Sequence, residues 1–320
     1  MKLRIWGLAN IVGSATFILV GCFTAVALAE TPAERGSYLV NSIGACGNCH
    51  ARDATENLNP SMALAGGVAL NRIDPGLPGH VVVPNITPDP DTGIGKWTEA
   101  DIVVALRNGK RPDGSIIGPP MPIPVYRELS DQDAMAVAAY LLSSQPERNA
   151  VQKSQYKIAL TEYGPPVVHV DAPSPEDKVA YGAYLVTFGH CVLCHTPPGD
   201  NEPLNMKLAF AGGHEFGSIG QIGPSVSRNI TSDPDQGLGK WTDDQIKDAI
   251  TKAVRPDSTK LAGPMPYDWY AKMTPNDIDA IVAFMRTIKP AKAQLDESDP
   301  NRVGACDGSL RCATRNAGTS

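Results

Sequence analysis

The chain carries one five-residue pattern twice, as Cys46-Gly47-Asn48-Cys49-His50 and as Cys191-Val192-Leu193-Cys194-His195. Two thiols three positions apart on a helical turn can each form a thioether to a haem vinyl group, and the imidazole of the next residue then lies under the iron. This spacing is typical of covalent c-type haem attachment. A redox dithiol or half of a zinc site is the alternative, but both copies carry the His and no other paired cysteines complete a zinc cage. The pattern predicts two covalently bound haems c, attached at Cys46, Cys49 and His50 and at Cys191, Cys194 and His195.

Two methionines between prolines offer a second ligand for each iron. Met121 lies in Gly118-Pro119-Pro120-Met121-Pro122, and Met265 lies in Gly263-Pro264-Met265-Pro266, at nearly the same distance along the chain from the histidine of its own copy. Proline restricts φ and removes backbone donors, so both segments should be stiff, extended loops. A methionine can instead fill a gap in a core. Because the repeat keeps both methionines, we predict that Met121 and Met265 are axial iron ligands.

The repeat extends beyond these sites. Ala65-Gly66-Gly67 recurs as Ala211-Gly212-Gly213, and two longer motifs, Asn-Ile-Thr-x-Asp-Pro-Asp from Asn85 and Gly-Lys-Trp-Thr from Gly95, recur from Asn229 and from Gly239 at one constant offset. This period exceeds any solenoid unit, and a copy of about 110 residues can bury its own core. We predict tandem domains at 30–142 and 178–290, with a signal peptide or anchor at 1–29, a polar linker at 143–177 and a polar tail at 291–320.

Helix signals bracket the predicted haem ligands in each copy. Apolar residues at helical spacing fill 32–43 and 175–188, and both runs lead into the Cys-x-x-Cys-His turn. Thr98 and Thr242 are typical N-caps of middle helices, and closing helices are expected at 130–142 and 274–288. The segments between them are rich in Gly and Pro, and no alternating strand pattern persists. The expected fold class is all-α, as two loop-rich domains in tandem.

This order of elements resembles class I cytochrome c. The Asn-Ile-Thr-x-Asp-Pro-Asp and Gly-Lys-Trp-Thr motifs are similar to those of the multihaem cytochrome c subunits of membrane-associated bacterial alcohol, aldehyde and gluconate dehydrogenases. The resemblance covers roughly 33–290 and concerns a two-domain portion, since a third Cys-x-x-Cys-His is absent. It implies no substrate pocket and no catalytic residue. The ligand set that it implies is thioether attachment at Cys46, Cys49, Cys191 and Cys194, proximal ligation by His50 and His195, and distal ligation by Met121 and Met265.

The function predicted from these features is electron transfer. A dihaem cytochrome would take single electrons from a periplasmic or membrane-bound dehydrogenase and pass them to a terminal oxidase, a quinone or a small cytochrome. The competing hypothesis is an enzyme, either a dihaem peroxidase or a sulfur-compound oxidoreductase, in which one iron has an open or displaceable ligand. The two matched Met loops argue against it. A membrane-anchored sensor ranks last, because nothing in the chain supplies an output domain.

The N-terminus is typical of an exported protein. Lys2 and Arg4 precede an apolar stretch that ends in Ala27-Leu28-Ala29, which indicates a signal peptide cleaved before Glu30. Two other interpretations stay open: a lipid anchor on Cys22, which follows Leu19-Val20-Gly21, or a retained membrane span. The expected location is the periplasm, either soluble or attached to the outer side of the bacterial plasma membrane.

Charge and the remaining side chains add further expectations. Loss of the two N-terminal cations would change the formal net charge from −6 to −8, and no Lys or Arg cluster appears, so we expect no nucleic-acid partner. Cys306 and Cys312 are expected to form a disulfide in an oxidising compartment. His190 and His214 lack counterparts in the first copy, which favours surface or haem-edge positions. Trp97 of the first copy recurs as Trp241 in the second. This recurrence fits packing near the haem and hydrogen-bond donation to a haem propionate equally well.

Overall fold

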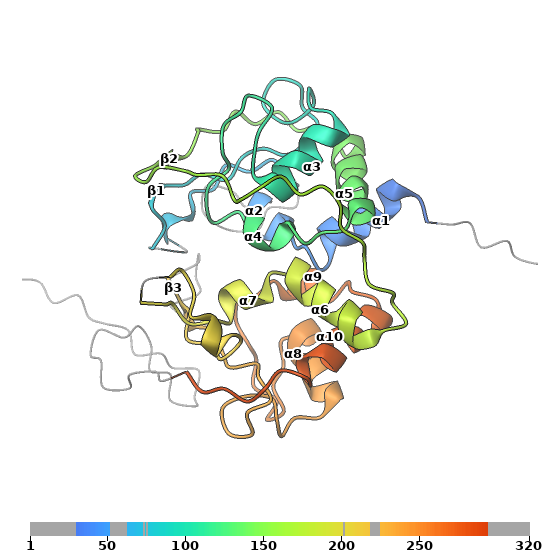
Figure 1. Cartoon of the computed structure of the whole chain (residues 1–320), viewed down its shortest axis with the longest axis vertical. Helices are drawn as coiled ribbons and strands as arrows, with labels where there is room; N and C mark the ends of the chain where they lie inside the picture. The colour runs from blue at the N-terminus through green and yellow to red at the C-terminus, as the bar shows by residue number, and fades with distance from the viewer. Residues whose placement is uncertain are drawn as a thin grey trace, which may run out of the picture. The chain divides into compact units, whose positions relative to one another are not determined.

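The computed structural model describes residues 30–51, 63–72, 74, 76–200, 202–217 and 225–293 (Figure 1). The described residues from Thr31 onward belong to one compact unit. The predictions for the segment 1–29, including lipidation of Cys22, and for the Cys306–Cys312 disulfide lie outside the described residues. Within the described ranges, no helix is both long and apolar enough to cross a membrane.

The helices follow the same order in the two copies. The first copy and the segment after it contain α1 (Pro32–Asn41), α2 (Gly47–His50), the 3-10 turn η2 (Leu70–Arg72), β1 (Gly79–His80), α3 (Glu99–Asn108), α4 (Ile123–Tyr126), α5 (Asp131–Ser143) and β2 (Gln155–Tyr156). The second contains α6 (Lys178–Phe188), α7 (Cys191–Cys194), the 3-10 turn η3 (Met206–Leu208), β3 (Glu215–Phe216), β4 (Ser225–Val226), α8 (Asp243–Lys252), α9 (Tyr267–Tyr270) and α10 (Pro275–Met285).

The predicted helix starts are confirmed by side-chain caps. Thr98 accepts a hydrogen bond from the backbone of Asp101, whose carboxylate accepts one from the Thr98 backbone N–H. Thr242 and Gln245 form the same reciprocal pair of hydrogen bonds, a capping box, at the start of α8. Such a box satisfies two of the free N–H groups at a helix start. The closing helix α10 begins after its N-cap Thr274, with proline at its first position as predicted.

In each copy the opening helix packs against the closing helix, α1 on α5 and α6 on α10. Glycine permits the close approach. A Cβ atom added to Gly36 would overlap the backbone carbonyl of Ala136, and one added to Gly182 would overlap that of Ala280. The crossing that positions the Cys-x-x-Cys-His turn is therefore the same in both copies, since each turn follows directly from its opening helix.

The two copies share one hydrophobic core cluster and a reciprocal pair of polar contacts. The Tyr38 hydroxyl donates to Asp277 at 2.6 Å, and the Tyr184 hydroxyl donates to Asp133 at 2.6 Å. In both cases a tyrosine of an opening helix contacts the acidic residue in the first turn of the other copy's closing helix. Because all four residues lie on the helices that carry the core, these bonds tie the two domains together.

The described residues are mostly helix and loop, which agrees with the helical class that we predicted. The strands are two-residue pairs, with β1 antiparallel to β2 and β3 antiparallel to β4. They were not expected, because segments this short carry no alternating pattern. They pair loop backbones whose N–H and C=O groups have no helical partner.

The segment after α5, which we predicted as a linker, packs along the first copy. Tyr156 donates from its hydroxyl to Pro119 O at 2.8 Å, and Tyr163 donates to Ile117 O at 2.8 Å. Both acceptors lie just before Met121. The segment therefore covers the first Met loop.

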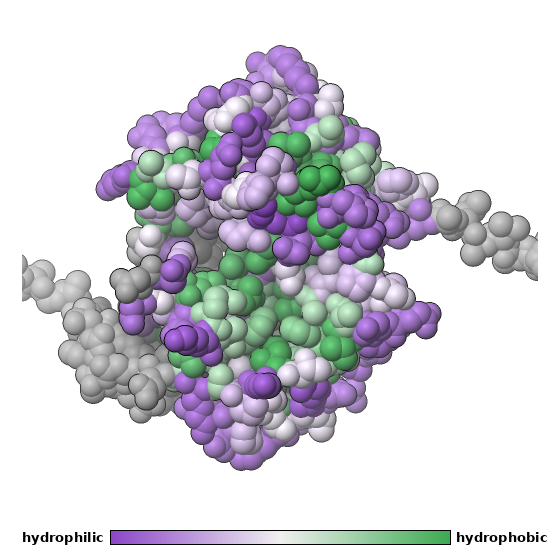
Figure 2. All heavy atoms as spheres, viewed as in Figure 1, coloured by the Kyte–Doolittle hydropathy of each residue, from purple (hydrophilic) through white to green (hydrophobic). Residues whose placement is uncertain are grey.

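The surface in Figure 2 mixes hydrophilic and apolar residues. The large apolar side chains that the described surface exposes come from several helices and loops, and single exposures of this kind are normal. They are Val104, Met135, Ile158, Val168, Val179 and Met206.

Candidate haem sites

Each Cys-x-x-Cys-His motif forms a single helical turn. In the first copy Cys46 is the N-cap of α2, and the His50 N–H donates to Cys46 O at 2.9 Å. In the second copy His195 is the C-cap of α7, and its N–H donates to Cys191 O at 2.9 Å. The turn brings both thiols and the imidazole of a motif to one place, as the spacing predicts.

The surroundings of the cysteines fit thioethers better than thiolates. Cys46, Cys191 and Cys194 form no disulfide in the described structure. Burial raises the pKa of Cys46, Cys191 and Cys194 to about 12. A redox dithiol needs a stabilised thiolate, which is the opposite condition. In the described part of the chain, no group of three or more His, Cys, Asp or Glu side chains gathers as a metal cage would require.

Both histidine rings are oriented by a backbone carbonyl. His50 Nδ1 lies 2.9 Å from Pro84 O, and His195 Nδ1 lies 2.7 Å from Arg228 O. Because a carbonyl only accepts, Nδ1 carries the proton and Nε2 keeps the lone pair that a metal needs. Burial lowers the pKa of His50 to about 4 and also lowers the pKa of His195. Both rings are therefore neutral at pH 7, in the form that binds iron.

The repeated Ala-Gly-Gly motif lies between each histidine and its carbonyl acceptor. Gly66 N–H donates to His50 O at 2.8 Å, and a Cβ on Gly66 would overlap Pro84 O. Gly212 N–H donates to His195 O at 2.7 Å, and a Cβ there would lie 2.6 Å from the carbonyl carbon of Arg228. Both glycines have positive φ, 66° and 77°. Only glycine fits this conformation and this space.

The Met loops lie beside the cysteine turns. Met121 and Met265 are half-buried and pack against the core cluster, and each precedes a one-turn helix, α4 or α9. The last residue of that helix, Tyr126 or Tyr270, is buried within electrostatic range of both cysteines of its own copy. Burial raises the pKa of both tyrosines well above the usual range. The tyrosine that follows each loop thus lies near the motif of its own copy, and Pro264 O of the second loop also accepts from Asn48 Nδ2 of the first motif at 3.5 Å.

The histidines without counterparts lie near these sites. Burial lowers the pKa of His190 to about 4, and its ring lies 6.4 Å from that of Tyr126 between centroids. His214 Nδ1 is buried and has no hydrogen-bond partner among the described residues. A positive charge on His214 would lower the pKa of His195. A buried donor or acceptor without a protein partner fits a position that contacts a bound group. Trp97 and Trp241 pack against the core cluster.

The residues that sequence reasoning missed act through their backbone. Pro84 and Arg228 share no side-chain chemistry, so no residue pattern marks them as acceptors. The signal that could have found them is positional, because each directly precedes the Asn-Ile-Thr motif that the repeat preserves.

Comparison with known proteins gives the family. The cytochrome c family matches twice, over residues 33–145 and 179–289. The cytochrome c subunit of a quinone alcohol dehydrogenase from Gluconacetobacter polyoxogenes is 31% identical over 287 residues, which cover 82% of this chain and 58% of that protein. The cytochrome subunit of fructose dehydrogenase from Gluconobacter japonicus is 31% identical over 286 residues, which cover 84% of this chain and 54% of that protein.

A dihaem relative matches over more of its own length. A diheme c-type cytochrome from Cereibacter sphaeroides is 29% identical over 260 residues, which cover 77% of this chain and 82% of that protein. By contrast, the chain spans little more than half the length of the two dehydrogenase subunits. The double match, the paired motifs and the neutral, oriented histidines lead to one conclusion: the chain belongs to the cytochrome c family, as two cytochrome c domains in tandem with two covalently bound haems c.

Proposed function

We propose that the chain carries single electrons from a periplasmic or membrane-bound dehydrogenase to the respiratory chain. The relatives that are named as cytochrome subunits of alcohol and fructose dehydrogenases support a dehydrogenase as donor. A terminal oxidase, a quinone or a small cytochrome is the proposed acceptor. The periplasmic side of the plasma membrane is the proposed location, reached by export through the N-terminal segment. The relatives give no support to the peroxidase alternative.

The proposed ligand set repeats in each copy. Cys46 and Cys49, and in the second copy Cys191 and Cys194, form the thioethers. His50 and His195 are the proximal ligands, and Met121 and Met265 are the distal ligands. The observation that supports the histidine assignment most is the Nδ1 contact with a carbonyl, which leaves Nε2 as the free ring nitrogen in both copies.

A bound haem supplies a reversible one-electron iron couple. The chain's own residues set the conditions for it. A neutral, hydrogen-bonded histidine is a firmly oriented donor, and a methionine thioether raises the potential relative to a second histidine. The apolar core that packs against Cys46, Met121, Cys191 and Met265 excludes water and limits the rearrangement that a change of charge requires. No residue in this scheme has to move a proton.

Purification from native membranes tests the proposed donor. The full-length chain with a C-terminal tag would be captured together with its partners, and the partners identified by mass spectrometry. We expect a dehydrogenase among them, and addition of that enzyme's substrate without oxygen should reduce the haems of the complex. Recovery of the chain alone would contradict the role as a stable dehydrogenase subunit. Rapid carbon monoxide binding at one reduced haem would favour the enzyme alternative instead, because two His/Met irons have no open position.

A further inference from the structure

We propose that the Asn-x-Thr pair of each copy, Asn85 with Thr87 and Asn229 with Thr231, positions the carbonyl that orients the proximal histidine and so tunes the potential of its own haem. We call each pair the bracket. The inference rests on the proposed ligand role of His50 and His195. It gives a role to the Asn-Ile-Thr motif, which the ligand set leaves unexplained.

In the first copy the bracket is a closed set of hydrogen bonds. Asn85 Oδ1 accepts from the Thr87 backbone N–H at 2.9 Å and from the Thr87 hydroxyl at 2.7 Å. Asn85 Nδ2 donates to Glu147 O at 2.8 Å, and Glu147 N–H donates to Thr87 Oγ1 at 3.1 Å. The two side chains therefore bind both the C=O and the N–H of Glu147. Thr87 is fully buried and Asn85 is 4% exposed, so water cannot replace these bonds at low cost.

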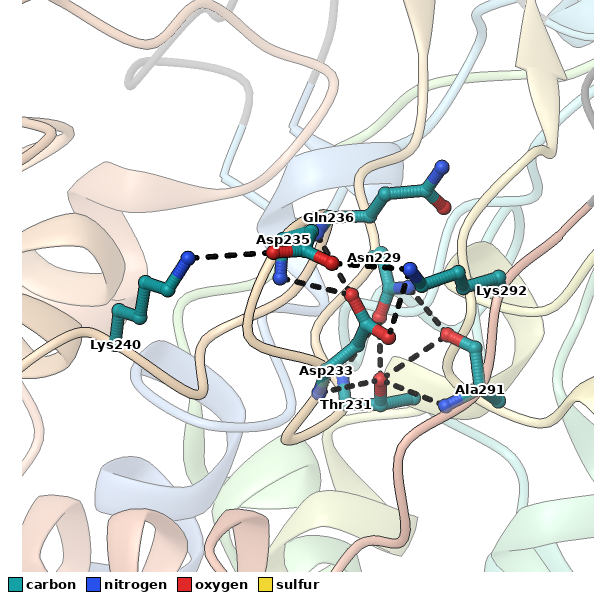
Figure 3. Close-up of polar contacts among 8 residues, drawn as sticks. All are labelled: Asn229, Thr231, Asp233, Asp235, Gln236, Lys240, Ala291 and Lys292. Carbon is teal, nitrogen blue, oxygen red and sulfur yellow. Dashed lines mark hydrogen bonds and ion pairs between the residues drawn. The ribbon is translucent and has the colours of Figure 1, made fainter.

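The second copy repeats the bracket (Figure 3). Asn229 Oδ1 accepts from the Thr231 N–H at 2.9 Å and from its hydroxyl at 2.7 Å. Asn229 Nδ2 donates to Ala291 O at 2.6 Å, and Ala291 N–H donates to Thr231 Oγ1 at 3.3 Å. Ala291 is the counterpart of Glu147 at the offset of the repeat. Glutamate and alanine have unlike side chains, so the bracket recognises the backbone of the segment after the closing helix.

The bracket adjoins the acceptor of the histidine. Asn85 directly follows Pro84, and Asn229 directly follows Arg228, so each asparagine shares a peptide unit with the carbonyl that accepts from His Nδ1. A hydrogen bond from the outer ring nitrogen of a ligating histidine orients the ring and raises its basicity. If the peptide unit loosens, the histidine becomes a weaker donor. The reduced iron is then favoured, and the potential rises.

Matched substitutions in the haem-loaded full chain test this inference. Thr87→Val keeps the side-chain volume and removes the hydroxyl, and Thr231→Val does the same in the second copy. We expect each variant to raise the potential of its own haem by at most about 59 mV. For one electron, this corresponds to a change of up to about tenfold in the reduction equilibrium. The other haem should keep its potential. Redox titration measures this, and electron paramagnetic resonance should show changed g values for the same haem, since they depend on the ring orientation.

Two controls separate positioning from the general loss of a loop hydrogen bond. Asp113 Oδ1 accepts from the Ser115 N–H at 2.9 Å, and Asp257 Oδ1 accepts from the Thr259 N–H at 2.9 Å, in a repeated turn outside the bracket. Asp113→Asn and Asp257→Asn should lower stability slightly and leave both potentials unchanged. Thr87→Ser keeps the hydroxyl and should restore the wild-type potential.

Several outcomes would overturn the proposal. They are unchanged potentials in both valine variants, equal shifts in the aspartate controls, or a shift in Thr87→Ser as large as that in Thr87→Val. If Thr87→Val fails to mature, Asn85→Ser provides the second test with the same expectation. Failure of the ligand assignment itself would be seen separately, as an unchanged iron spectrum in His50→Gln, a variant that leaves the bracket intact.

Discussion

Both copies contain the bracket and the histidine–carbonyl bond, which together we call the haem frame. The side chains that support this frame differ between the copies. In the first copy, the Asn149 side chain donates to Ala65 O at 3.0 Å and to Gly66 O at 3.2 Å, which holds the Ala-Gly-Gly motif from outside. The equivalent residue of the second copy, Ala293, has no such donor. There Lys292 forms ion pairs with Asp235 at 3.1 Å and with Asp233 at 3.8 Å (Figure 3).

This difference shows which parts of the frame are general. The bracket and the histidine–carbonyl bond use backbone groups, and both copies keep them. The outer support uses side chains. Both copies have an exposed ion pair there, Arg148–Asp91 in the first and Lys292–Asp235 in the second, and the first copy adds the half-buried amide hydrogen bonds of Asn149. Because exposed pairs are screened by salt and amide hydrogen bonds are not, we expect the two frames to respond differently to ionic strength.

Replacement of the proposed distal ligands should have the largest effect on the difference between the two haems. Met121→His and Met265→His exchange a thioether for an imidazole, and axial ligands move haem potentials over a range of about 0.8 V. We expect each variant to lower the potential of its own haem by on the order of 0.1–0.2 V, because methionine raises the potential relative to histidine. Redox titration of both haems would measure it.

Exposed methionines provide the controls for that experiment. Met135 is 41% exposed on α5, and Met206 is 60% exposed on η3, so each copy has one. Met135→Leu and Met206→Leu should leave both potentials at their wild-type values. If Met121→His behaved in the same way, Met121 would not be a ligand, and the two copies would differ in their iron ligands as well as in their support.

A smaller effect is expected from removing the outer support of the first copy. Asn149→Ala leaves the carbonyls of Ala65 and Gly66 without their side-chain donor, which should lower the free energy of unfolding by about 1–2 kcal/mol. Urea unfolding monitored by the haem spectrum measures the loss. The exposed amide of Gln152 provides the matched control, and Gln152→Ala should change little. Equal losses in the two variants would mean that Asn149 does not support the motif.

A still smaller effect is expected from Lys292→Ala, because its nearer partner, Asp235, is exposed. Lys292 lowers the pKa of Asp235 through its hydrogen bond and charge, and the carboxylates raise the pKa of Lys292. A lowered carboxyl pKa adds stability above the unfolded value of about 3.9 and loses it as pH falls through the folded value. The difference from wild type should therefore be present at pH 7 and vanish in acid. Thermal unfolding between pH 3 and 8, at low and high salt, measures it.

Arg148→Ala is the counterpart in the first copy, where Arg148 pairs with Asp91 at 3.2 Å. We expect a still smaller and equally salt-dependent change, since this arginine reaches one carboxylate where Lys292 reaches two. A Lys292 effect that persisted at high salt would show that the second copy is not supported by electrostatics.

Local signals predicted most of the helices correctly. Thr98, Thr242 and Thr274 begin helices because a short polar side chain caps the first N–H groups, which depends only on neighbours in sequence. The linker prediction did not anticipate packing along the first copy. Tyr156 and Tyr163 bind carbonyls that are distant in the sequence, and nothing in their own neighbourhood specifies those acceptors.

The sequence by itself determined the tandem repeat, the two Cys-x-x-Cys-His turns and the helices around them, because each depends on residue types at short spacing. Only the tertiary structure decided which backbone carbonyl orients each histidine and which segment closes the bracket. These contacts join the histidine to a loop well separated from it in the sequence, and that loop to a segment still further along the chain. Backbone groups are the same in every residue except for proline's missing N–H, so the fold alone selects them.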